Sequence, residues 1–198
     1  MKLFFIPGAC SLAPHMVLEE LGLTYEAVRV HKDKTYNGGN FLDINKKGYV
    51  PTLCLENGEI LTEVATICLY LADQRPDKNL VPKSGMDRYR CLEWLNFIAT
   101  EMHKGFSPLW KDTTPDSYKA VVKEKLTAQF SFLSSHLKES VFLMNAYTVA
   151  DAYLFTILNW ANFLKWDISQ WTVLMGYIEK IRSRPATFNA MKGEGLIK

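Results

Sequence analysis

Cys10 is the residue of this sequence whose neighbours most favour reactivity. It lies in Pro7-Gly8-Ala9-Cys10-Ser11, between a strand predicted at residues 2–6 and a helix predicted from Ser11 to Leu21, which Gly22 ends. The N–H groups of the first helical turn and the positive end of the helix dipole favour a thiolate over a thiol. We therefore predict a reactive cysteine here, with an ordinary loop cysteine as the alternative.

Two further positions could bind a peptide-like ligand beside this thiol. Pro51 opens a predicted strand, where thioredoxin-like folds place a cis peptide bond next to the thiol, so Val50 could pair its backbone with a bound peptide. Glu63 lies in the first turn of a predicted helix, and its carboxylate could bind a ligand ammonium group while helix N–H groups bind a carboxylate. A structural strand-edge proline and a glutamate that only starts a helix are the alternatives.

The first 75 residues predict an α/β, thioredoxin-like domain in the order βαβ and then ββα. Asn57-Gly58 is a strong hairpin signal, because both turn positions need a positive φ. The elements that follow the first helix are a strand at 26–30, hairpin strands at 52–55 and 59–61, and a helix that Thr62 caps and that runs to about Ala72.

Residues 76–85 predict a linker, and residues 86–198 predict an all-helical domain. The helical signals are a long segment from Met86 to Trp110, starts at Thr114-Pro115-Asp116, at Thr148 and near Ser169, and an end at Arg184-Pro185. Pro115 is expected at the first helical position, and Thr148 with Asp151 resembles a capping box.

The long predicted helix carries a polar and aromatic face beside its core stripe. Such a mixture suits a cleft wall better than a core, although a lone helix histidine is often structural; the face consists of Asn96, Ala99, Thr100, His103, Phe106, Ser107 and Trp110. Pro108 should bend this helix. An apolar pocket for an electrophile is predicted at Phe106, Trp110, Trp160 and Phe163, with membership of the core as the alternative.

The composition excludes several classes of function. The 198 residues include 23 Lys and Arg against 21 Asp and Glu, a net charge of +2 that gives no reason to expect nucleic acid. The longest apolar stretch is interrupted by polar residues and falls short of the roughly 20 residues that span a bilayer. The apolar run after Lys2 is too short for a secretory signal. We therefore expect a cytoplasmic protein with no membrane partner.

The four cysteines give no sign of a metal centre. Cys10, Cys54, Cys68 and Cys91 form no C-x-x-C pair and have no zinc-binding spacing. The sequence therefore predicts no metal and no disulfide framework.

Together these segments resemble the bacterial beta-class glutathione transferases, from residue 1 to the tail Glu194-Gly195-Leu196-Ile197. The motifs that carry the resemblance are the Pro-Gly-Ala-Cys-Ser segment after the first strand, Asn45-x-x-Gly48-x-Val50-Pro51, Leu61-Thr62-Glu63, Glu93-Trp94-Leu95-Asn96, His103-Lys104-Gly105-Phe106 and Thr148-x-Ala-Asp151-Ala152-Tyr153-Leu154-Phe155. The resemblance implies the two-domain glutathione-transferase architecture, glutathione as cosubstrate, a hydrophobic electrophile and a homodimer.

The resemblance also implies roles for single residues. Cys10 is expected to contact the glutathione sulfur or form a mixed disulfide with it, and His103 is expected to form a hydrogen bond or handle a proton. The loop around Lys34 is shorter than in the family. The positions expected to bind glutathione are Ser11, Lys34, Val50, Pro51, Glu63, Val64, Asn96 and Thr100.

The implied activity is conjugation of the glutathione thiol to soft electrophiles in detoxification, with thiol-disulfide exchange or peroxidase activity as side reactions. Two alternatives stay open. One is a one-cysteine glutathione-dependent disulfide reductase that acts through Cys10. The other is a weakly catalytic binding protein, because Phe5 stands where the family commonly has tyrosine and Val64 where it usually has a smaller residue.

Overall fold

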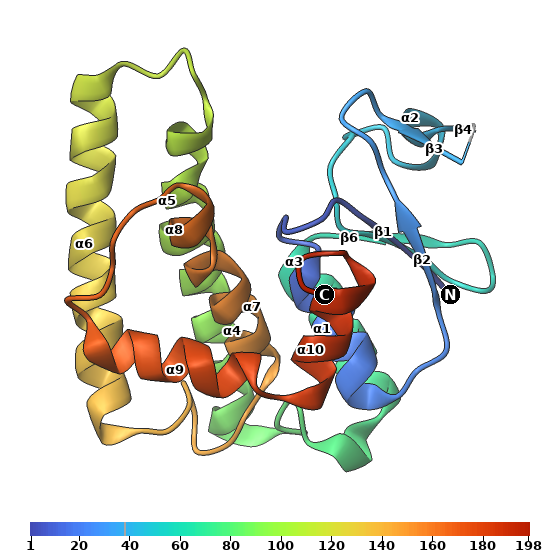
Figure 1. Cartoon of the computed structure of the whole chain (residues 1–198). Helices are drawn as coiled ribbons and strands as arrows, with labels where there is room; N and C mark the ends of the chain where they lie inside the picture. Colours follow the sequence, from blue (N-terminus) through green and yellow to red (C-terminus); the bar gives the residue numbers. More distant parts are fainter. Residues whose placement is uncertain (38) are drawn as a thin grey trace.

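The computed structural model describes residues 1–37 and 39–198. Its N-terminal part is built on a mixed sheet in the order β2-β1-β5-β6 (Figure 1). β1 runs parallel to β2 and antiparallel to β5, as the predicted βαβ and hairpin units require. The strands are β1 (Lys2–Phe5), β2 (Glu26–Arg29), β5 (Thr52–Cys54) and β6 (Ile60–Thr62).

Helices cover both faces of this sheet. Successive side chains of a strand point to opposite faces, so Leu3 joins the core under α1 (Leu12–Leu21) and α3 (Val64–Gln74), whereas Phe4 packs with Phe41 of α2 (Phe41–Ile44). Gly22 ends α1 in the left-handed conformation, as predicted. The small pair β3 (Thr35–Tyr36) and β4 (Gly39–Asn40) lies beside α2.

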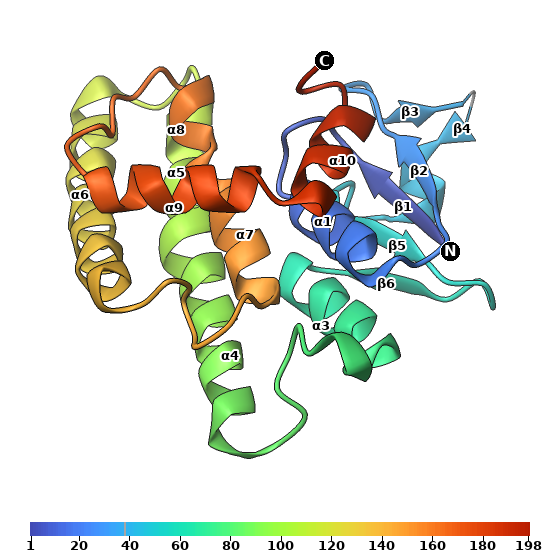
Figure 2. The same ribbon diagram turned by 60° about the horizontal axis from the view of Figure 1, so that its bottom comes forward.

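The C-terminal part is helical, and the thioredoxin-like and helical architecture predicted from the sequence is confirmed. Its first helices lie beside α6, and α9 crosses them (Figures 1 and 2). The bounds are α4 (Gly85–Phe97), α5 (Lys104–Phe106), α6 (Asp116–Glu139), α7 (Val149–Leu158), α8 (Trp160–Phe163), α9 (Thr172–Arg182) and α10 (Pro185–Gly193).

The two parts share one packed boundary. Helix α1 packs on both α7 and α10, and Figure 2 shows α10 lying against the N-terminal part rather than with the other helices. The predicted capping box of α7 is present, with the buried Asp151 carboxylate accepting the Thr148 N–H at 2.8 Å. The same carboxylate accepts the Tyr177 hydroxyl at 2.9 Å, which ties α7 to α9.

The structure corrects four expected boundaries. The single helix predicted from Met86 to Trp110 is divided into four pieces: α4, a π-helical turn at Ile98–His103, α5 and a 3₁₀ turn at Ser107–Trp110. Pro108 lies in the last of these and has no amide hydrogen to donate. Pro115 precedes α6 instead of opening it. Thr62 belongs to β6, so α3 begins at Val64. Pro185 opens α10, a helix that the sequence reading missed.

Across the described ranges, 1–37 and 39–198, no helix is both long and apolar enough to span a membrane.

Candidate functional site

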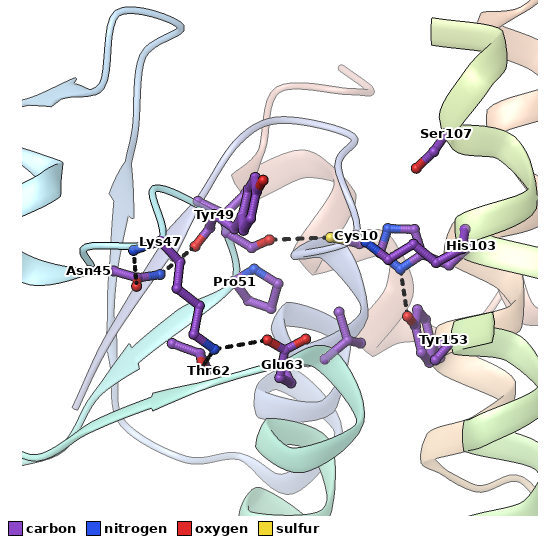
Figure 3. Close-up of a pocket in the computed structure, with 14 residues that line it drawn as sticks. Cys10, Asn45, Lys47, Tyr49, Pro51, Thr62, Glu63, His103, Ser107 and Tyr153 are labelled. Atoms are coloured by element: carbon purple, nitrogen blue, oxygen red, sulfur yellow. Dashed lines mark hydrogen bonds and ion pairs between the residues drawn. The ribbon is translucent and has the colours of Figure 1, made fainter.

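A cavity of about 280 Å³ lies where the loops of the sheet domain face α5 and α7. This volume lies just below the range, roughly 300–1,000 Å³, that is typical of small-molecule sites. Figure 3 shows that its walls come from both parts of the chain. The lining residues are Cys10, Asn45, Lys47, Tyr49, Val50, Pro51, Thr62, Glu63, Val64, Ala99, His103, Lys104, Ser107 and Tyr153.

The Cys10 thiol and the backbone of Val50 meet at this cavity. Cys10 Sγ donates a hydrogen bond to the Val50 carbonyl over 3.3 Å (Figure 3). The Val50-Pro51 peptide bond is cis, as the thioredoxin-like pattern predicted. Forty positions of sequence separate the two groups, so the fold has brought together the thiol and the backbone that we expected to face one ligand.

Cys10 is a neutral thiol in this structure. Burial raises its pKa to about 12, and this cost outweighs the backbone N–H groups of Cys10 and Ser11, which act in the opposite direction. In the protein without a ligand, burial therefore outweighs the preference for a thiolate that the helix N-terminus gives Cys10. A neutral thiol can still donate a hydrogen bond, as Cys10 does to Val50.

The loop that carries Cys10 is held at Gly8 from two directions. Its N–H donates to Glu194 Oε2 at 2.9 Å, and its carbonyl accepts from Trp160 Nε1 at 2.9 Å. Glu194 in turn contacts the buried His15 at 3.0 Å. Gly8 has a φ of 72°, a conformation that favours glycine, and an added Cβ would lie 2.9 Å from the Phe163 ring. Thus two side chains of the C-terminal part hold the loop that carries the thiol.

His103 forms the opposite wall near Cys10. Its Nδ1 lies 2.6 Å from the Tyr153 hydroxyl, and its ring packs edge-on against Trp160 at a centroid distance of 5.0 Å. Burial, followed by the nearby Lys104 charge, lowers the His103 pKa to about 4. His103 is therefore neutral at physiological pH. It ends the π-helical turn, a feature that often occurs at functional sites.

The other end of the cavity is charged and open to solvent. Glu63 Oε1 pairs with Lys47 Nζ at 3.0 Å, and the same ammonium donates to Thr62 Oγ1 at 2.9 Å. The side chains of Glu63 and Lys47 are 70% and 53% exposed. Glu63 has a φ of 73° at the start of α3, a costly conformation for a residue other than glycine, and such residues gather at functional sites.

Six of the residues predicted from the sequence line this cavity, and a seventh supports it. Cys10, Val50, Pro51, Glu63 and Val64 come from the sheet domain, and they face His103 across the space. Ser11 is buried behind the cavity, where its hydroxyl bonds the backbone of Ile6.

The remaining predicted residues lie outside the cavity. Lys34 Nζ donates to the Gly48 carbonyl at 2.7 Å. Asn96 and Thr100 are exposed and bond carbonyls of their own helix, so their contact with glutathione stays a prediction.

The predicted electrophile residues do not form one pocket. Phe106 and Trp160 are buried in the core, where they touch at 5.9 Å between ring centroids. Trp110 and Phe163 are 45% and 52% exposed and do not line the cavity. The core alternative thus describes Phe106 and Trp160, because both pack against aromatic neighbours.

Sequence reasoning missed several lining residues. Ala99 and Ser107 belonged to the predicted cleft face, four positions before and after His103, but were given no role. Lys47 and Lys104 could have been found from the sequence, because each is a charged residue inside a motif that carries the family resemblance. Tyr153 lay in another such motif, although nothing local indicates that its hydroxyl reaches His103 fifty positions away.

Comparisons with known proteins agree with this geometry. A family model described as the N-terminal domain of glutathione S-transferase matches residues 8–74, and one described as its C-terminal domain matches residues 97–185. The chain is 41% identical to glutathione S-transferase GstA of Escherichia coli O157:H7, over 99% of this chain and 100% of that protein.

Two solved structures are also similar. A sphingomonad glutathione S-transferase complexed with glutathione is 42% identical, with a TM-score of 0.95 and 100% of both chains covered. A bacterial beta-class glutathione S-transferase of Sphingomonas chungbukensis is 39% identical, with a TM-score of 0.96 and the same coverage of 100% for each chain.

Proposed function

Because this chain belongs to the glutathione S-transferase family and is similar throughout to its bacterial beta-class members, we propose that its cavity holds glutathione with the sulfur between Cys10 and His103. The chain is a transferase that uses glutathione. The observation that carries the proposed pose is the contact of 3.3 Å between the Cys10 thiol and the Val50 carbonyl at the cavity wall.

The charged end of the cavity suits the γ-glutamyl end of glutathione. The carboxylate of Glu63 binds the ligand's ammonium group, which then takes the place that Lys47 Nζ occupies. The N–H groups of the first turn of α3, beginning at Val64, have no acceptor within the helix and bind the ligand's carboxylate. The side chain of Val64 is bulkier than the residue usual in the family, but its backbone N–H can still bind a carboxylate.

The extended middle of glutathione pairs with the backbone of Val50. A carbonyl oxygen accepts two hydrogen bonds, so the Val50 carbonyl can take an N–H of the ligand while Cys10 turns toward the ligand's sulfur. Cys10 then donates its S–H to a thiolate instead of forming a second thiolate beside it. Two adjacent thiolates would repel one another.

The sulfur end stabilises the thiolate of glutathione with neutral donors. Lowering a thiol pKa from about 8.5 to about 7 takes roughly 2 kcal/mol, which a small number of hydrogen bonds can supply. The proton of the glutathione thiol passes to water, and the thiolate attacks a soft electrophile such as chlorodinitrobenzene. A carbon–sulfur bond forms, and the leaving group departs with the electrons of the bond that breaks.

The electrophile enters beside the sulfur, from the open side of the cavity near Trp110 and Phe163. Both rings are exposed; Phe163 lies against Gly8 of the loop that carries Cys10, and Trp110 packs edge-on against Trp160. We further propose a role in detoxification in the cytoplasm and a homodimer, in which Lys34, Asn96 and Thr100 contribute to glutathione binding. Gel filtration together with light scattering tests the dimer.

A second candidate function is thiol-disulfide exchange. The observation in its favour is that Cys10 Sγ lies at the cavity wall, where it could form a mixed disulfide with glutathione. The raised pKa of Cys10 argues against it, because the attacking species in disulfide exchange is a thiolate.

The variant Cys10→Ala distinguishes the two functions. We expect conjugation of chlorodinitrobenzene to fall about three- to tenfold, the loss of one hydrogen bond, while any exchange with hydroxyethyl disulfide disappears. Retention on immobilised glutathione should persist. Intact mass before and after reductant shows whether glutathione is linked covalently. Loss of all conjugation in the variant, with retention on glutathione intact, would support a covalent role for Cys10 instead.

A further inference from the structure

Tyr153 lines the cavity and has no role in the function proposed above. It lies in α7 and is buried, with its hydroxyl 2.6 Å from His103 Nδ1 (Figure 3). Within residues 1–37 and 39–198, the Tyr153 hydroxyl has no hydrogen-bond partner other than His103 Nδ1. The contact joins two elements that meet at the sulfur end of the cavity.

The direction of this hydrogen bond follows from what each partner can do. Burial raises the pKa of Tyr153, so its hydroxyl keeps its proton. If His103 Nδ1 donated the bond, the phenolic proton would be left without an acceptor in a buried position, at a cost of roughly 1–3 kcal/mol. If the phenol donates, both atoms are satisfied. His103 Nδ1 is therefore the acceptor.

The remaining proton of the ring must then be on Nε2. A neutral imidazole carries one N–H, and His103 is neutral. Nε2 has no hydrogen-bond partner within the described residues and is accessible to solvent. The ring itself lines the cavity. Trp160, packed edge-on against it, restricts its rotation.

We propose that Tyr153 is a positioning residue, which holds His103 in the tautomer whose Nε2–H points into the cavity. His103 then donates a hydrogen bond to the thiolate of glutathione and does not act as the base that removes its proton. The proposal rests on the proposed function, since it places the sulfur beside His103. It assigns the hydrogen-bonding role, rather than the proton-handling one, to this histidine.

The first experiment observes the tautomer directly in the protein without glutathione. The chain has four histidines, and the difference between the ¹⁵N spectra of the wild type and His103→Gln assigns the His103 ring. We expect the proton on Nε2 in the wild type and a mixture of tautomers in Tyr153→Phe. A proton on Nδ1 in the wild type overturns the proposal. Because no ligand is used, this result does not depend on whether the proposed function is correct.

The second experiment measures the effect on catalysis. We expect Tyr153→Phe to lower kcat for chlorodinitrobenzene conjugation about three- to tenfold, with the KM for glutathione unchanged, because the missing hydrogen bond matters once the sulfur is charged. The ultraviolet absorbance of the bound thiolate should titrate at higher pH in the variant. A rise in KM with kcat unchanged contradicts the proposal.

Tyr147→Phe is the matched control for this substitution. Tyr147 is also a buried tyrosine of the helical part, but its hydroxyl has no partner among the described residues and lies outside the cavity. Tyr147→Phe removes the same hydroxyl oxygen as Tyr153→Phe, but it should leave both kcat and KM unchanged. An equal loss of kcat in both variants would mean that Tyr153 acts through packing alone, against the proposal.

The double variant separates positioning from packing. The side-chain amide of His103→Gln presents an N–H near the place of Nε2 but has no tautomer for Tyr153 to select. We therefore expect His103→Gln to keep a measurable part of kcat and Tyr153→Phe to change it less than about twofold in that background. If the two effects multiply fully, Tyr153 does not act through His103.

Discussion

The two ends of the cavity treat charge in opposite ways. At one end the side chains of Glu63 and Lys47 are exposed, and they pair at 3.0 Å. At the other end burial raises the pKa of Cys10 to about 12 and lowers that of His103 to about 4, so both are neutral. One cavity therefore combines an exposed ion pair, which suits the charged end of the proposed ligand, with a buried thiol and imidazole that are both neutral.

The difference indicates how the work of binding and of chemistry is divided. Charged groups in contact with water hold a ligand's charged end without a large desolvation cost. Neutral donors in a buried site become favourable when a negative charge develops between them, as with a thiolate and the transition state that follows it. Binding energy at the exposed end can thus bring the sulfur to the buried end.

The largest expected effect is on the alkylation rate of Cys10. A reactive Cys10 in the free enzyme would contradict the contrast between a charged end and a neutral end of the cavity. With a pKa of about 12 instead of 9.0, Cys10 has about a thousandfold less thiolate at neutral pH than an ordinary cysteine. A more basic thiolate is also a better nucleophile, so we expect iodoacetamide to react roughly fiftyfold more slowly than with an unhindered thiol.

Intact mass measures this rate in a Cys54→Ala background, which removes the half-buried Cys54 from the count. The rate should rise close to tenfold for each pH unit between pH 7 and 9. Rapid alkylation at pH 7, mapped to Cys10, would mean that the sulfur end is not neutral.

The next effect is the pH dependence of stability at His103. Its pKa is about 4 when folded and 6.5 as the ordinary value, so the unfolded chain takes up a proton at higher pH than the folded one. This contribution is complete above about pH 6.5 and is lost as the pH falls toward 4. We expect the wild type to lose on the order of 2 kcal/mol more than His103→Gln between pH 7.5 and 5.

Urea unfolding of the two proteins at both pH values measures this difference, and the contributions of the other titratable groups cancel. Parallel loss of stability in the two proteins would show that His103 is not held neutral by the fold.

The smallest effect concerns the exposed end. We expect Glu63→Gln to weaken glutathione binding about tenfold, the lower range for a hydrogen bond to a charged group, because the site is open to water. The free energy of unfolding should change by less than about 1 kcal/mol, since an exposed ion pair contributes little.

Lys47→Met is the control. It breaks the same ion pair but leaves the carboxylate of Glu63 for the ligand, so calorimetric titration should show no weaker binding of glutathione. If the two variants lose affinity equally, the ion pair itself and not the Glu63 carboxylate forms the binding site.

Local sequence signals predicted most of the sheet domain. Asn57-Gly58 marked the turn between β5 and β6, although Gly58 has the predicted positive φ and Asn57 does not, and Gly22 ended α1; both signals depend on the backbone of a few neighbouring residues. Pro185 was misleading for the same reason. Proline ends one helix and is also favoured in the first turn of the next, and here it opens α10.

The protonation of the site could not be predicted in this way. The environment of Cys10 in sequence, a loop before a helix, favours a thiolate, but burial decides its pKa, and burial comes from packing against distant parts of the chain. Tyr153 and Lys47 were missed because their contacts with His103 and Glu63 span 50 and 16 positions. Residue types indicated the chemistry, whereas the fold set the charge of each group.

The hydrogen bond from Gly8 to Glu194 spans 186 positions of sequence. A ribosome must therefore synthesise almost all of these residues before the loop around the thiol acquires its final shape. A chain cut before Glu194 would retain every cavity-lining side chain and the hydrogen bond from Trp160 to Gly8, but it would lack the other hydrogen bond that holds this loop, so we expect it to fold in outline with the thiol less firmly positioned.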